Sequence, residues 1–306
     1  MNKYYLMLIC SVFLFSVQFV FTKCYQRERG AHFSSSILQI VLSSVFFVLF
    51  YLILNDFKFG FTLFSFVMAL LYAINGITAT VFGMKVLERA NLSVYTLFLM
   101  LGGVILPFFY GLFIGESLTV FKVVAVILIA LSLFIGVEKD KDKKANAMLI
   151  ICCMVIFLAN GFAHILTHFH QRSTSDTLNT SGFLLLSFTC KFVISGVIFI
   201  VVTCVGKRKN NDNVEQPVTV SEKSRVIKSW LITIGVVIGY AAVSGLAQFI
   251  SAYTSLYVDA GIKAAIITGG CIFMSIFFGL IFGEKITAIK ITQLLLAVSG
   301  VILIML

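Results

Sequence analysis

The chain has 306 residues, of which 60% are hydrophobic and only 12% are charged. A soluble domain carries about 25% charged residues, so this composition excludes a water-covered globular domain and indicates lipid as the solvent. The net charge of +10 could indicate nucleic acid as a partner. Because the basic residues sit in short loops between apolar segments, we expect them to set membrane orientation and expect no nucleic-acid partner.

Ten segments are apolar enough to cross a hydrocarbon core of roughly 30 Å, which needs about 20 helical residues. In chain order they are 4–23, 33–54, 61–84, 92–114, 119–137, 146–168, 182–205, 229–252, 260–282 and 287–306. The first is expected to remain as a helix, because it lacks the small-x-small cleavage site of a signal peptide. The sequence therefore predicts an all-α membrane protein with ten transmembrane helices.

Two of the connecting segments are long and polar. One is EKDKDKKA at 138–145, and the other is a loop at 206–228 that is too polar to fold alone. Seventeen of the 23 lysines and arginines fall in or nearest to the loops after the first, third, fifth, seventh and ninth segments. The positive-inside rule then places both termini outside the cytosol.

The sequence contains an internal repeat. Residues 111–122 read GLFIGESLTVFK and residues 279–290 read GLIFGEKITAIK, with six of twelve positions identical at an offset of 168. Two further pairs occur in the same order: TKCYQR at 22–27 with THFHQR at 167–172, offset 145, and VLSSVFF at 41–47 with VISGVIF at 193–199, offset 152. We therefore predict two homologous five-helix units, at 1–145 and 146–306.

An odd number of helices in each unit has a geometric consequence. The second unit must enter the membrane upside down relative to the first, which gives two inverted five-helix repeats. Inverted repeats are the architecture of many secondary transporters, which bind substrate near the membrane midplane between the two units.

Two sets of residues resemble the ten-helix EamA-type permeases of the drug/metabolite transporter superfamily. Phe15-Ser16-Val17-Gln18-Phe19-Val20 followed by Lys23 is similar to that family's first-helix pattern, with Phe-Ser in place of the usual Trp-Gly. The pairs Gly115-Glu116 and Gly283-Glu284, each followed by Thr and then Lys, are similar to its repeated signature. The resemblance implies a bacterial plasma-membrane permease and says little about the substrate.

Polar groups inside a bilayer are costly, so they are expected to face protein or water. Tyr240, Ser244, Gln248 and Ser251 fall on one stripe of the eighth helix. Small residues such as Ser244 and Gly76 can instead serve close helix packing. The predicted cavity residues are Gln18, Asn75, Tyr95, Asn160, His164, Tyr240, Gln248 and Lys263.

Two lysines and three histidines leave alternatives open. Lys263 can extend to the interface or face the cavity and neutralise an anionic substrate. Lys191 lies deeper and is expected to anchor neighbouring helices. The histidines at 164, 168 and 170 could form a metal site. No acidic or cysteine partner accompanies them, so we expect no metal. If transport is coupled to protons, His164 is the candidate.

These features predict a secondary transporter for a small polar metabolite, anionic or zwitterionic, such as an amino acid. The expected partners are this solute and the bilayer, with no cofactor, and the chain is expected to be a monomer or a homodimer. One alternative is a membrane-embedded enzyme that uses the histidines on a lipid-linked substrate. A scaffold protein without transport activity is a third possibility. Glu116 and Glu284 are expected to fix loop geometry.

Overall fold

The computed structural model describes residues 3–30, 32–89, 92–117, 119–135, 147–174, 176–209, 220–281 and 288–304. Within these ranges the chain forms ten α-helices and no strand. They are α1 (Lys3–Arg29), α2 (Phe33–Leu54), α3 (Leu63–Arg89), α4 (Leu92–Phe113), α5 (Val120–Ile135), α6 (Ala147–Arg172), α7 (Thr180–Lys209), α8 (Val220–Thr254), α9 (Ala260–Ile281) and α10 (Ala288–Ile304). The segment 138–145 and the pair Gly283-Glu284 lie outside the described residues.

Six of these helices, α1, α2, α3, α6, α7 and α8, are long and apolar enough to cross a membrane. The other four contain shorter apolar stretches in their described parts: Phe98–Phe113 in α4, Val120–Ile135 in α5, Ala260–Met274 in α9 and Ile291–Leu303 in α10. The protein is therefore an all-helical membrane protein in the part of the chain that the structure describes, as its composition predicts.

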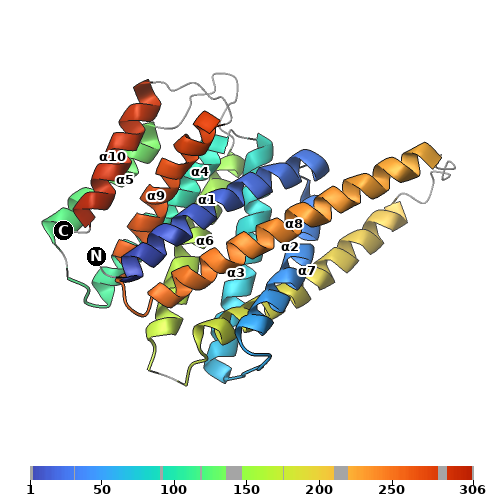
Figure 1. Ribbon diagram of the computed structural model, residues 1–306, viewed down its shortest axis with the longest axis horizontal. Helices are drawn as coiled ribbons and strands as arrows, with labels where there is room; N and C mark the ends of the chain where they lie inside the picture. The colour runs from blue at the N-terminus through green and yellow to red at the C-terminus, as the bar shows by residue number, and fades with distance from the viewer. Residues whose placement is uncertain are drawn as a thin grey trace.

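The polar segment at 206–228 differs from expectation at both ends. Helix α7 continues to Lys209 and α8 begins at Val220, so the described flanks of the predicted loop are helical. Hydropathy indicates only which part of a helix can contact lipid. Because a helix satisfies its own backbone hydrogen bonds, it can continue past the bilayer into polar sequence. In Figure 1, α7 and α8 extend together to one end of the molecule.

Contacts at the helix ends show whether neighbouring helices are parallel or antiparallel. Helix α2 is antiparallel to α7, because Ser181 at the start of α7 donates to Asn55 Oδ1 at the end of α2 (2.7 Å). Helix α4 is antiparallel to α9, because the backbone N–H of Ala260 donates to Glu116 Oε1 just past the end of α4 (2.8 Å).

Two further helix pairs have the same antiparallel packing. Helix α1 crosses α8 along its length, with Arg29 donating to Thr233 Oγ1 (3.0 Å) at one end and Tyr4 stacked on Tyr257 at the other. Helix α3 packs in the same way against α6, because Ser65 Oγ near the start of α3 lies 2.9 Å from His170 Nε2 near the end of α6.

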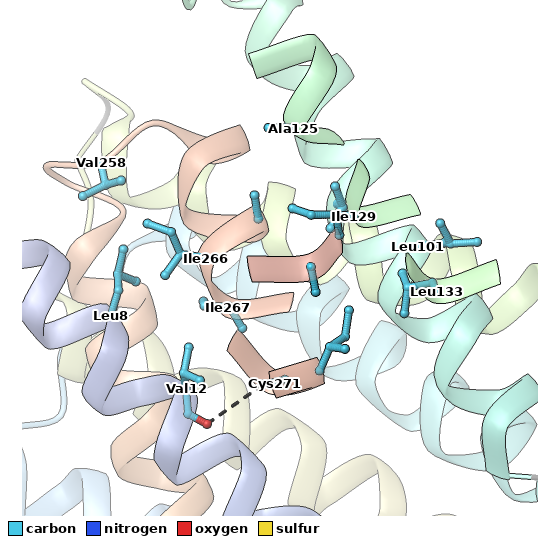
Figure 2. Close-up of a cluster of buried hydrophobic side chains, with 14 residues drawn as sticks. Leu8, Val12, Leu101, Ala125, Ile129, Leu133, Val258, Ile266, Ile267 and Cys271 are labelled. Carbon is cyan, nitrogen blue, oxygen red and sulfur yellow. Dashed lines mark hydrogen bonds between the residues drawn. The ribbon is translucent and has the colours of Figure 1, made fainter. Parts of the chain in front are cut away.

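The two largest apolar clusters lie on opposite sides of the molecule and hold most of the helices together. The first joins α1, α4, α5, α9 and α10 through side chains that include Leu8, Val12, Ile129 and Ile266. Figure 2 shows these residues converging, with the Cys271 thiol directed at the carbonyl oxygen of Val12. The second joins α2, α3, α7 and α8 around aromatic residues such as Phe47 and Phe188. The space between the two clusters is where a polar site can lie.

Candidate functional site: a polar cavity between the helices

A cavity of about 240 Å³ lies between α1, α3, α6, α7, α8 and α9. Its polar lining residues are Gln18, Tyr72, Asn75, Asn160, His164, Thr167, Lys191, Gln248, Ser251 and Lys263. Pockets for drug-sized ligands measure roughly 300–1,000 Å³, so this smaller volume suits a small metabolite. No aspartate or glutamate lines the cavity within the described part of the chain.

Six of the eight predicted cavity residues line this cavity, and two do not. Tyr95 packs against Gly83, where an added Cβ would lie 2.9 Å from the tyrosine ring, and belongs to an apolar cluster with Cys152 and Cys153. Tyr240 packs edge-on against Phe47. Tyr95 and Tyr240 are therefore not among the described residues that line this cavity, and their rings pack between helices.

The set of helices that forms the cavity wall differs from the prediction by one helix. The prediction of Tyr95 as a cavity residue places α4 in the wall, but α7 contributes Leu184 and Lys191, while no α4 side chain that the structure describes lines the cavity. Helix α4 lies behind α6, where the Asn160 amide donates to the Leu99 carbonyl (2.7 Å). Close packing at Gly102 explains this position, because an added Cβ there would overlap the carbonyl oxygen of Phe157.

A chain of hydrogen bonds crosses the cavity from α3 to α8. The Tyr72 hydroxyl donates to Gln248 Oε1 (3.1 Å), and Gln248 Nε2 donates to Ser244 Oγ (2.9 Å). Asn75 donates to the carbonyl oxygen of Ala159 (2.8 Å) and ties α3 to α6. These bonds orient the polar wall and connect the first five helices to the last five.

Gln18 on α1 carries a buried polar atom without a protein partner. Its Oε1 is buried and has no hydrogen bond to any described residue, although the side chain lines the cavity. Buried polar atoms in folded proteins are almost always hydrogen-bonded to protein or to water. A molecule in the cavity that brings a donor would satisfy this oxygen.

Lys191, which is predicted to anchor neighbouring helices, also lines the cavity. Its Nζ lies 5.7 Å from the centre of the Phe188 ring, a cation–π arrangement. Gly76 on α3 leaves room for it, since an added Cβ there would lie 3.3 Å from Nζ. Gly76 thus accommodates a lysine in addition to permitting helix packing.

Lys263 lines the cavity and is buried. Only 1% of the residue is exposed, and its Nζ donates to Ser255 Oγ (2.6 Å). The Ser255 hydroxyl in turn donates to the Ser251 carbonyl oxygen (3.1 Å) at the end of α8. Lys263 therefore sits where the cavity meets the helix ends of the α8–α9 connection.

Charged residues join the helix ends around this connection. We call the following five residues the Glu116 cluster: Glu116, Lys122, His168, Arg172 and Asp259. Asp259 lies 3.4 Å from Lys122 Nζ and 3.9 Å from an Arg172 nitrogen. Glu116 Oε1 lies 3.8 Å from His168 Nε2. The cluster thereby connects the ends of α4 and α6 to the starts of α5 and α9.

Glu116 caps α9 from the other half of the chain. Its carboxylate accepts the Ala260 N–H at the first turn of α9, a position where negative charge is favourable. Burial raises the pKa of the Glu116 carboxyl, and the hydrogen bond from the Ala260 backbone opposes this rise. Gly115 has a positive φ of 83° that turns the chain, and at Gly111 any Cβ would overlap the Glu116 carboxylate. The repeated Gly-x-x-x-Gly-Glu pattern thus has a structural purpose here.

Glu116→Ala should lower the stability of the folded protein by about 1 kcal/mol, the usual effect of losing a helix cap. Glu116→Gln keeps an acceptor oxygen at the same place and should lose less. Thermal unfolding of both variants in the same detergent measures the difference. Equal unfolding midpoints for Glu116→Ala and the unchanged protein would contradict the capping role.

The three histidines of α6 lie in three different surroundings. His164 lines the cavity, and His168 meets the Tyr110 ring and Glu116. His170 contacts Ser65 Oγ (2.9 Å) and stacks on Phe183. Within the described residues, no group of three or more His, Cys, Asp or Glu side chains is arranged to hold a metal ion.

Comparisons with known proteins bear on the fold alone. No family model matches the sequence, and no curated protein matches it. A solved structure described as "Crystal structure of protein" aligns with a TM-score of 0.68 over 99% of this chain and 96% of that chain, at 12% identity. This helical arrangement is therefore shared with a known structure, and at that identity the likeness carries no information on function.

Proposed function

We propose that this protein is a secondary transporter that moves a small polar metabolite, anionic or zwitterionic, across the membrane by alternating access. The observation that carries the proposal is the polar cavity, whose wall combines α1 and α3 with α6, α7, α8 and α9. A cavity between the two halves of a membrane protein, lined by buried polar and cationic groups, is where transporters bind their substrates.

Helix directions support an inverted repeat. Corresponding helices of the two units, α2 with α7 and α4 with α9, run in opposite directions. An equivalent close contact also recurs in the two units: Gly102 meets Phe157, and Gly270 meets Val12 at 2.7 Å from an added Cβ. These partners differ by 168 and 145 residues, the same offsets that relate the sequence repeats. In such an architecture the two units can exchange conformations, which opens the cavity to each side in turn.

The Glu116 cluster suggests where this exchange would act. It joins helix ends from both units, so opening the cavity on that side requires its contacts to separate. These are surface-exposed or partly exposed ion pairs, which are worth roughly 0–1 kcal/mol each and can break and re-form readily.

A transport assay with a blocked variant tests the proposal. The purified protein in liposomes should take up at least one compound from a mixture of small polar metabolites, identified by mass spectrometry. Ala163→Trp places an indole in the cavity wall and should stop uptake. Phe162→Trp, at the neighbouring residue, which is 48% exposed on the outer face, should leave it unchanged. Uptake of no compound, or equal uptake by both variants, would refute the proposal.

A further inference from the structure

The Lys191 ammonium has no anionic partner among the residues that the structure describes. It lies eleven residues after the start of α7, about 16 Å along the helix and near the middle of a 30 Å hydrocarbon core. Its one described contact of an electrostatic kind is the ring of Phe188. No described carboxylate lies within ion-pair distance of it, and no described residue accepts a hydrogen bond from it. A charge in the middle of a span is costly unless it is paired or faces a water-filled cavity. Lys191 is half-buried and lines the cavity, so a negative group bound there would supply its missing partner.

Lys263 contributes a second positive charge at the other end of the cavity. It lies three residues after the start of α9, about 5 Å along that helix. The charges around it do not cancel. Three cations meet here, Lys263 with Lys122 and Arg172 of the Glu116 cluster, against two carboxylates, Glu116 and Asp259. Among the described residues, one positive charge remains at this end, and Lys191 adds another further along.

From this arrangement we infer that the cavity takes an organic dianion, with one negative group against Lys191 and the other against Lys263. The inference rests on the proposed transport function and names the substrate class of the same site. Two surplus cations in a wall without carboxylates are neutralised by two negative charges, and their different depths favour charges at the two ends of one small molecule. Hydrogen bonds between an ammonium and a carboxylate or phosphate are among the strongest that a protein forms.

Charge-matched ligands test this directly on the full-length protein in detergent. The probes are the straight-chain dicarboxylates from succinate to adipate, the monomethyl ester of each, and the matching neutral diamides. At least one dicarboxylate should raise the unfolding midpoint, and its monomethyl ester, with the same length and one charge fewer, should bind at least tenfold more weakly. Titration calorimetry gives both dissociation constants.

Lys191→Met provides a second, sharper outcome. Without one of the two cations, the preference for the diacid over its monoester should fall to less than threefold. Lys58→Met, which removes an exposed lysine after α2, should retain the full preference.

If every dicarboxylate fails to bind, or if the monoester binds as well as the diacid, the dianion inference is wrong. The transport proposal would survive that result if a zwitterionic or neutral metabolite is taken up in the liposome assay. The dianion inference and the transport proposal would fail together only if no dicarboxylate binds and no metabolite is taken up.

Discussion

Gly102→Ala should destabilise the protein by about 3 kcal/mol or more, the upper end of the usual effect of overpacking. Helices α4 and α6 touch here through their backbones. A Cβ on Gly102 would overlap the carbonyl oxygen of Phe157, and one on Gly161 would lie 2.6 Å from the carbonyl oxygen of Gly102. Backbone atoms cannot rotate away as a side chain can. A single methyl group must therefore push apart the two helices that support the cavity wall.

Gly196→Ala is the matched control for this substitution. Gly196 also lies within a helix, α7, but no atom lies within 4 Å of its added Cβ. There the substitution should be neutral or stabilising by up to about 1 kcal/mol, because alanine has the higher helix propensity. Thermal unfolding of the two variants in one detergent should separate them clearly. Similar midpoints would mean that α4 and α6 do not pack as closely as this structure has them.

Lys263→Met should abolish most transport while leaving the protein folded. Removing one partner of a buried charge-assisted contact costs about 2–5 kcal/mol, which corresponds to at least about a 30-fold loss of substrate affinity. Folding should survive because Ser255 keeps its bond to Ser251, and Asp259 keeps Lys122 and Arg172. Methionine also fills a similar volume.

The measurements for Lys263→Met are uptake into liposomes and the unfolding midpoint. A midpoint within a few degrees of the unchanged protein, together with lost uptake, supports a direct role at the substrate. Unchanged uptake would show that the ammonium does not contact the substrate. A large fall in the midpoint would instead make Lys263 a structural residue that holds the α8–α9 connection.

Hydropathy predicts the helices of this protein well, because lipid contact imposes long apolar runs with clear ends. Helix α2 occupies residues 33–54 as predicted, and the other helices begin or end within a few residues of expectation in most cases. Larger differences occur at the end of α1, which continues past residue 23 to Arg29, and in the α7–α8 region, where Lys209 and Val220 belong to helices that continue through polar sequence. The polar side chains in this region indicate that water surrounds the helices, and they do not indicate a loop.

The site is predicted less completely, since a sequence gives the face and depth of a residue but not the helix that it meets. Gln18, Asn75 and Lys263 are found in the cavity because large polar groups in a span must avoid lipid. Tyr240 shares that stripe, yet its ring fills a gap beside Phe47. The sequence predicts an anchoring role for Lys191, and only the three-dimensional arrangement shows Gly76 opposite it, leaving room for its ammonium at the cavity wall.

Thiol accessibility at the cavity wall tests alternating access most directly. All seven cysteines can be replaced and a single one introduced as Ala163→Cys, a small change at a lining position. In liposomes, a membrane-impermeant thiol reagent should label this position when added from either side, and a transported substrate should slow labelling from both. Labelling from one side alone under all conditions would contradict a cavity that opens alternately between two inverted halves.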